Sequence, residues 1–270
     1  MKTLTIFLRK GHKWSDGEPF TTDDLMFFYE DVLMNKELTP VIPSRWSPGG
    51  KPVKFIKVDD VTIKFQYQVP FPRIFDVFQR GTFGGHMFVY APKHAMKKYH
   101  IKYNSNANEL AKKEGFTNWV QLFRSHAKKG WSWDEDPEIP TLAEWATVSV
   151  STERKVLMRN PYFHWIDTQG NQLPYIDKID DVLTREHEVH NLKIMSGEID
   201  LAGFSTHTED YPLLKSNEKQ GNYVAELAQS LRGSEAAFYP NLTVKDPVLR
   251  KIFQDIRFRQ ALSLSINRDE

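Results

Sequence analysis

Apolar and polar residues alternate along several short stretches of the chain, which is the pattern of β-strands that bury one face. At the beginning, Leu4, Ile6 and Leu8 share one face of such a strand. Further on, Asp59 and Asp60 separate two alternating stretches and indicate a hairpin. The pattern predicts strands over residues 3–9, 53–58, 61–67, 146–151, 155–159, 176–184, 199–201, 223–228 and 236–242.

Other stretches repeat their apolar residues every three or four positions, and this spacing predicts helices. Thr21, followed three residues later by Asp24, forms a capping box at the start of one helix. Asp246 and Pro247 begin another helix, and Gly197 ends a third. Helices are expected from residue 21, over 73–79, 104–129, 186–196 and 209–219, and from residue 246, where Val248, Ile252, Phe253, Ile256, Ala261 and Leu264 form an apolar stripe.

Helices, strands and hairpins follow one another without a regular alternation. A parallel doubly wound sheet would need strands and helices in strict turn, so the sequence predicts a mixed α/β (α+β) fold. The hairpin near residue 145 is the expected boundary between two subdomains, residues 1–145 and 146–270. At 270 residues, the chain is long enough for one large domain or two small ones.

The charges of the chain balance, with 36 Lys and Arg against 35 Asp and Glu and a net charge of +1. No overall positive field is therefore available to hold nucleic acid or an anionic membrane. The absence of cysteine excludes disulfides, thiolate metal sites and a cysteine nucleophile. No charge-free stretch is long enough to cross a bilayer. The first residues run into a strand pattern rather than a secretory signal, so the chain is expected to begin inside a fold.

Motifs for catalysis, metal binding or phosphate binding are weak or absent. His187 and His190 lie three residues apart on a predicted helix, a spacing that can hold a metal, but the sequence shows no third ligand. A solvated helix face is the preferred interpretation. Residues 167–171 resemble a calcium loop only in composition, because Lys178 stands where a bidentate Glu is needed. With no nucleophile elbow and no phosphate-binding glycine pattern, the sequence predicts no enzyme, catalytic residue, metal or cofactor.

Aromatic residues make up 13% of the chain, and several lie beside Gly or Pro, where loops hold them. Sugar rings and peptide side chains both bind on aromatic surfaces that carry a few polar groups. Core packing is the alternative role for each of these rings. Tyr239 and Asn241 are two residues apart on a predicted strand and would share a face. The candidate ligand-binding residues are Tyr239, Asn241, Phe238, Phe83, Gly84, His86, Trp145 and Trp46.

Four longer stretches carry a resemblance to a known family. They are Thr5–Asp24 (TIFLRKGHKWSDGEPFTTDD), Arg159–Ile179 (RNPYFHWIDTQGNQLPYIDKI), Ser196–Leu201 (SGEIDL) and Asp246–Glu270 (DPVLRKIFQDIRFRQALSLSINRDE). Together they resemble the family 5 extracellular solute-binding proteins, the peptide-, nickel- and oligosaccharide-binding components of ABC importers. The four stretches follow the order of the family and spread over nearly the whole chain, whereas family members are considerably longer.

The resemblance implies a periplasmic-binding-protein-like fold of class II, cluster C. Residues 1–145 would form an extra subdomain of the first lobe, and residues 146–270 the main domain of that lobe up to the hinge, with the second lobe absent. Residues 236–243, which precede the expected hinge helix, would face the cleft. A receptor of this kind captures an oligopeptide or an oligosaccharide and delivers it to a membrane permease.

The same resemblance implies a periplasmic or extracellular location, with a lipoprotein anchor in the intact protein and no nucleic-acid partner. The chain is expected to be a monomer whose truncated edges can associate. Two other hypotheses stay open, a ligand-free structural or interaction fragment and an enzyme built on a binding-protein-like fold. The sequence does not choose between peptide and sugar as the ligand.

Overall fold

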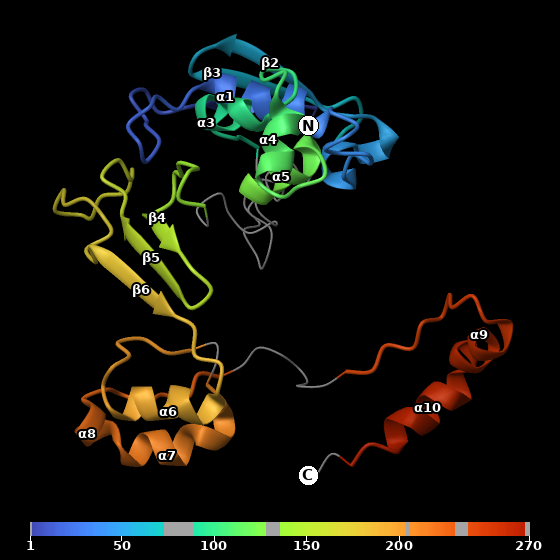
Figure 1. The fold of residues 1–270 in the computed structure, drawn as a ribbon. Coiled ribbons are helices and arrows are strands. Elements are labelled where there is room, and N and C mark those ends of the chain that lie inside the picture. The colour runs from blue at the N-terminus through green and yellow to red at the C-terminus, as the bar shows by residue number, and fades with distance from the viewer. Residues whose placement is uncertain (1, 73–88, 128–135, 204–205, 230–236, 268–270) are drawn as a thin grey trace. The chain divides into compact units, whose positions relative to one another are not determined.

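The structure is a computed structural model that describes residues 2–72, 89–127, 136–203, 206–229 and 237–267. The chain divides into two compact units, Met1–Arg185 and Glu186–Glu270, and each is described by itself (Figure 1). Helices and strands mix in the first unit, whereas the regular elements of the second unit are helices among the described residues, separated by irregular segments. The chain as a whole has the mixed α/β fold that the sequence predicts.

An antiparallel sheet of three strands begins the first unit. Its strands are β1 (Thr3–Phe7), β2 (Lys54–Asp59) and β3 (Thr62–Gln66), in the order β1-β3-β2. Ile63 and Phe65 of the central strand are both 0% exposed, and Leu4 and Ile6 of β1 pack on the same core. The alternation in the sequence therefore predicted both the strands and the buried face.

Helix α1 (Thr22–Phe27) packs against this sheet (Figure 1). Its start confirms the predicted capping box, because the Thr21 hydroxyl accepts the Asp23 N–H at 3.2 Å and the Asp24 carboxylate accepts the Thr21 N–H at 3.0 Å. The helix continues into a π-helical segment, η1 (Phe28–Leu33).

Short helices complete the first core. They are η2 (Ser44–Trp46), η3 (Pro48–Gly50), α3 (Lys93–Met96), η4 (Lys97–Tyr99), α4 (Ala107–Lys113) and α5 (Trp119–His126). The single helix expected over 104–129 is thus two helices, because Gly115 adopts a left-handed φ of 84° and Asn118 caps α5 anew by accepting the Gln121 N–H. The largest buried side chains of this core are Trp14, Trp46, Tyr67, Tyr99, Phe27, Phe65 and Phe123.

A second antiparallel sheet follows, with strands β4 (Trp145–Val150), β5 (Arg154–Arg159) and β6 (Lys178–Val182) in that order (Figure 1). The predicted hairpin and third strand are therefore confirmed. The loop between β5 and β6 is anchored by Asn160, which is 0% exposed and donates from its amide to the Ala143 carbonyl at 2.9 Å. Several apolar side chains of this sheet are exposed, among them Val148, Val150, Met158 and Val182.

The second unit consists of short helices: α6 (His187–Met195), η6 (Thr208–Asp210), α7 (Tyr211–Ser216), α8 (Glu218–Gly221), α9 (Pro247–Gln254) and α10 (Ile256–Leu264). The long last helix expected from residue 246 is two helices, since Asp255 leaves the helical conformation and caps α10 through the Arg257 N–H. Neither α9 nor α10 has a buried residue in the structure. The apolar stripe predicted there is present in the sequence but covers no core among the described residues.

Three predicted strands are wrong. The described residues of 199–201, 223–228 and 236–242 contain no strand. A strand requires a partner for its backbone N–H and C=O groups, and none of these segments pairs with another in the described part of the chain. Alternation alone was therefore not sufficient to predict a strand.

The expected subdomain boundary near residue 145 differs in place from the division at residue 185. The core built around the first sheet draws its residues from positions 4 to 142, and the second sheet begins at Trp145. The boundary near 145 stays a prediction about subdomains within a lobe. Among the residues described, no helix is both long and apolar enough to cross a membrane.

Candidate ligand-binding site

Phe238 and Tyr239 present their rings to solvent, with exposed fractions of 68% and 89%. They lie in an irregular segment of the second unit. Asn241 is also exposed, and its side-chain oxygen accepts both the N–H and the hydroxyl of Thr243 at 3.0 Å, which closes a local turn. Tyr239 and Asn241 therefore do not share the face of a strand as expected, although the aromatic surface itself is available.

The two candidate tryptophans differ in their surroundings. Trp145 is half-buried on β4, and its Nε1 donates to the Ile176 carbonyl at 2.9 Å, which fixes the indole at the end of the second sheet. Trp46 is 1% exposed, and its ring centroid lies 5.4 Å from that of Phe55 in the first core. For Trp46 the alternative role of core packing describes the structure, because a ring with no free surface has nothing to offer a ligand.

Phe83, Gly84 and His86 fall outside the described residues, as does the helix expected over 73–79. Their assignment to a ligand site stays a prediction. Trp145, Phe238 and Tyr239 are consequently the predicted aromatic residues that the structure leaves accessible.

The structure brings together a basic crevice that the sequence did not predict. Its volume is about 190 Å³, and it lies between the loop after β1 and the loop after β5. The guanidinium of Arg9 donates to the His164 carbonyl at 3.0 Å, and the Lys13 ammonium lies 5.2 Å from the ring centroid of Tyr162. The residues that line the crevice are Arg9, Lys10, Gly11, His12, Lys13, Tyr162 and His164.

Two histidines in this crevice face each other with ring centroids 4.9 Å apart. Desolvation lowers the pKa of His12 and of His164, and the cationic Arg9 nearby lowers both further. The buried His12 Nε2 and His164 Nδ1 have no hydrogen-bond partner among the described residues. Three cationic side chains beside two neutral imidazoles form a surface suited to a polar or anionic group. The sequence did not indicate this crevice, because the residues before Lys13 and those around Tyr162 are about 150 positions apart. Both stretches were interpreted as structural.

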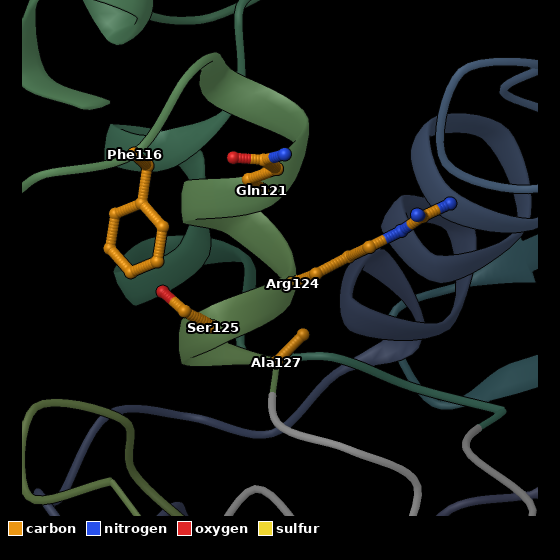
Figure 2. Close-up of a pocket in the computed structure, with 5 residues that line it drawn as sticks. All are labelled: Phe116, Gln121, Arg124, Ser125 and Ala127. Carbon is orange, nitrogen blue, oxygen red and sulfur yellow. The ribbon is translucent and has the colours of Figure 1, made fainter. Parts of the chain in front are cut away.

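A wider apolar groove of about 530 Å³ runs along α5 (Figure 2). Phe116 supplies its aromatic wall, and Arg124 extends from the other side of the helix, where it donates to the Leu38 carbonyl at 2.8 Å. The polar atoms at this groove are engaged locally, since the Gln121 side chain accepts the Thr117 N–H and the Ser125 hydroxyl donates to a helix carbonyl. The groove therefore offers apolar contact and few groups for orienting a ligand.

Potential metal ligands gather at one other place in the described chain, where His187, His207 and Asp210 lie together in the second unit. The sequence had singled out His187, but with His190 as its neighbour. Among the described residues that line the two crevices, there is no carboxylate that could act beside a base.

Comparison with known proteins gives the family of the chain. Residues 1–270 match the family of bacterial extracellular solute-binding proteins, family 5 Middle. The chain is 31% identical over 182 residues to the periplasmic alpha-galactoside-binding protein of Rhizobium meliloti, which covers 66% of the chain and 23% of that protein. It is 24% identical over 282 residues to the periplasmic oligopeptide-binding protein OppA of Escherichia coli, covering 99% of the chain and 42% of that protein.

Solved structures agree with this family. An oligopeptide-binding protein OppA superposes with a TM-score of 0.73 and 36% identity, covering 99% of the chain and 42% of that protein. The periplasmic binding protein MelB of Agrobacterium fabrum C58, in complex with stachyose, superposes with a TM-score of 0.59 and 25% identity over 82% of the chain and 30% of that protein. The chain spans less than half the length of these relatives. By its match along all 270 residues, the chain belongs to the bacterial extracellular solute-binding proteins of family 5.

Proposed function

We propose that this chain is part of an extracytoplasmic receptor of an ABC importer, which captures an oligopeptide or an oligosaccharide and delivers it to a membrane permease. The observation that carries the proposal is the family match over residues 1–270. The names of the relatives include oligopeptide-binding and alpha-galactoside-binding proteins, so both ligand classes belong to the proposal.

The accessible aromatic residues support this function. Phe238 and Tyr239 expose flat rings, and the indole of Trp145 is held in place by its hydrogen bond to the Ile176 carbonyl. Such rings stack equally well on the apolar face of a sugar and on peptide side chains. Because these residues offer no nucleophile with an adjacent base, the proposed role is binding and not catalysis.

The arrangement of the intact receptor belongs to the same proposal. Residues 1–145 form an extra subdomain of a first lobe, and residues 146–270 form the main domain of that lobe up to the hinge. A second lobe closes over the ligand, which excludes water and strengthens the polar contacts. The receptor acts as a monomer at the outer face of the membrane, held there by a lipid anchor.

The test is a calorimetric binding measurement on two proteins. One is a full-length receptor that contains this chain, and the other is the chain of residues 1–270 alone. A pentapeptide and stachyose are the two probes. We expect the full-length protein to bind one class with a Kd of about 1 μM or tighter, and the 270-residue chain to bind at least about 100-fold more weakly, because half the contacts are missing.

Tyr239→Ala in the full-length protein should weaken binding about tenfold, which corresponds to ~1.4 kcal/mol. The matched control is Phe7→Ala, because Phe7 is another largely exposed aromatic residue (75%, against 89% for Tyr239) and lies on β1. Absence of binding by either probe would leave the ligand-free fragment as the better hypothesis. Tight binding by residues 1–270 alone would contradict the two-lobe arrangement while leaving the capture function intact.

A further inference from the structure

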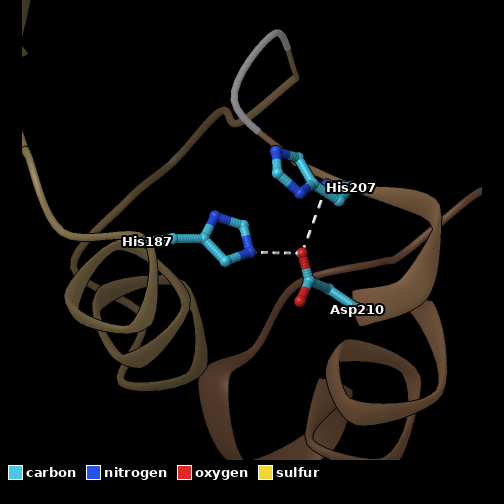
Figure 3. Close-up of side chains that lie close together, drawn as sticks. All are labelled: His187, His207 and Asp210. Atoms are coloured by element: carbon cyan, nitrogen blue, oxygen red, sulfur yellow. Dashed lines mark hydrogen bonds and ion pairs between the residues drawn. The ribbon is translucent and has the colours of Figure 1, made fainter.

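Two histidines and an aspartate from separate segments meet in the second unit (Figure 3). His187 lies at the start of α6, while His207 and Asp210 lie at η6, ahead of α7. The Nε2 of His187 is 2.8 Å from a carboxylate oxygen of Asp210, and the two imidazole rings stack with centroids 4.3 Å apart. One nitrogen or oxygen from each of the three side chains lies within 4.8 Å of the others.

A backbone group also holds the Asp210 carboxylate in place. The backbone N–H of His207 donates to the same oxygen of Asp210 at 3.2 Å (Figure 3). The carboxylate is only 15% exposed, whereas the His207 side chain is exposed. One histidine and the carboxylate are thus positioned by the fold, and the His207 side chain, which accepts the Asp210 N–H in a capping box, lies beside them.

A fourth polar group, Asn191, lies beside this cluster and lacks a full set of partners. It is 5% exposed, one turn along α6, and its amide nitrogen is 3.3 Å from the Nε2 of His187. Its buried side-chain oxygen has no hydrogen-bond partner among the described residues. The Asn191 amide also donates to the Asp210 carboxylate; a half-turn of the amide gives up that bond and brings the unpartnered oxygen to the cluster.

We propose that His187, His207 and Asp210 bind a divalent transition-metal ion of the zinc type, with Asn191 as an adjacent oxygen donor. Two imidazole nitrogens and a carboxylate oxygen are a donor set that zinc prefers when no thiolate is present. The ion takes the place of the proton between His187 and Asp210. The two atoms are now 2.8 Å apart and would separate to roughly 3.4 Å, the distance between two tetrahedral ligands that each lie about 2.0–2.2 Å from one metal. The exposed His207 ring supplies the third bond by leaving its stack on His187 and its capping contact with the Asp210 N–H.

The half-exposed position leaves coordination sites open to water or to a polar group of another molecule. The ion would also tie α6 to the segment before α7, in a unit that buries few apolar side chains. This inference is independent of the proposed solute capture, since it requires neither a peptide nor a sugar. The simpler alternative is a metal-free ion pair between His187 and Asp210, and the experiment separates the two.

The test is a zinc titration of the tag-free 270-residue chain, stripped of metal, followed by calorimetry. We expect one zinc ion per chain with a Kd of roughly 1–10 μM, a value typical of a half-exposed site with three protein ligands and weaker than that of closed structural sites. His207→Ala removes the exposed ligand, together with its stack on His187 and its capping contact with the Asp210 N–H, and should raise the Kd at least about 30-fold. His190→Ala is the matched control and should change the Kd less than about threefold, because His190 lies on the same helix outside the cluster.

Two further measurements complete the test. Cobalt should give the visible absorption of a site with nitrogen and oxygen ligands in the wild type and lose it in the His207→Ala protein. Zinc should raise the melting temperature of the wild type and of His190→Ala but not of His207→Ala, since an ion that binds only the folded state stabilises it. Absence of binding at about 100 μM zinc, equal binding by the His207→Ala protein, or loss of binding in His190→Ala would each overturn the proposal.

Discussion

A single carboxylate, that of Asp24, joins three segments of the first unit. It accepts the backbone N–H of Thr21 at 3.0 Å, the backbone N–H of Lys93 at 3.0 Å and the indole N–H of Trp14 at 3.3 Å. Asp24 is 4% exposed, and desolvation raises its pKa in spite of these three donors. The sequence predicted only the first of these contacts, because the capping box is local and the other two donors reach Asp24 through the fold.

Replacing Asp24 should therefore cost more than the loss of a helix cap. Asp24→Ala leaves three donors without their partner, and we expect the free energy of unfolding to fall by about 2–4 kcal/mol. Urea unfolding monitored by tryptophan fluorescence measures it. Asp23→Ala is the control, because Asp23 lies next in sequence but is 51% exposed and pairs with Lys57, so its loss should cost less than about 1 kcal/mol. Equal losses in the two variants would contradict the role of Asp24.

Buried histidines make the stability of the first unit sensitive to acid. His100 is 1% exposed; its Nε2 lies 3.0 Å from the Asp31 carbonyl, and its Nδ1 accepts the Lys102 N–H at 3.2 Å. Desolvation lowers the pKa of His100, and it also lowers the pKa values of His12 and His164. In the folded state these rings therefore remain neutral to lower pH than in the unfolded chain.

We expect the free energy of unfolding to fall as the pH drops below about 6.5, the ordinary pKa of histidine. Below that pH the unfolded chain binds more protons than the folded chain, and acid therefore favours unfolding, whereas above it these histidines contribute no slope. The measurement is urea unfolding at a series of pH values for the wild type and for His100→Gln. The variant should show a shallower decline in this range, and an unchanged slope would show that His100 does not carry the effect.

At the scale of elements, the helix end at Gly197 was predicted correctly, whereas three of the expected helices proved to be divided. Gly197 was expected to end a helix, and it does so after α6 with a φ of 76°. The structure adds a contact that the sequence could not contain, because a Cβ at this position would lie 2.7 Å from the Gly221 carbonyl oxygen. Gly197 is therefore needed both for its backbone conformation and for the close approach of the α8 end.

Gly197→Ala should destabilise the second unit by about 2–3 kcal/mol, through the left-handed φ and the contact with a backbone oxygen together. Gly203→Ala is the matched control in the same unit, since Gly203 is not left-handed and a Cβ there meets nothing within 4 Å. It should change the stability by less than about 0.5 kcal/mol. Thermal unfolding followed by circular dichroism compares the two, and a control as destabilised as Gly197→Ala would refute the steric explanation.

At the scale of the whole molecule, the two units differ in the size of their cores. The first is built around a cluster of 22 buried apolar residues. In the described part of the second, Ile194 and Leu214 are the buried apolar side chains. Because burial of apolar surface is the main stabilising term, the second unit should be the less stable one.

Calorimetry should accordingly show two thermal transitions, with the second unit unfolding at the lower temperature. Gly197→Ala should shift only the lower transition and Asp24→Ala only the upper one. A single transition that both substitutions shift would show that the units unfold together. Addition of zinc should raise the temperature of the transition that belongs to the second unit, because the proposed metal site lies in that unit alone.

Local chemistry explains most of what the sequence predicted correctly. The capping box at Thr21, the hairpin at Asp59 and Asp60, and the helix end at Gly197 depend on residues within a few positions of one another. The four motifs likewise led to the correct family. The Asx-type turn at Asn241 and the unpaired segment around it were missed because a strand depends on a partner elsewhere in the chain.

The sequence by itself therefore determined the family, the mixed α/β fold, the helix caps at Thr21 and Asp246, and the first sheet with its buried face. Only the tertiary structure decided which aromatic residues are accessible, with Trp46 in the core and Tyr239 in solvent. It also decided that His187 meets His207 and Asp210 rather than His190. The physical reason is that burial and clustering result from contacts between distant segments, and neither composition nor spacing records which segments meet.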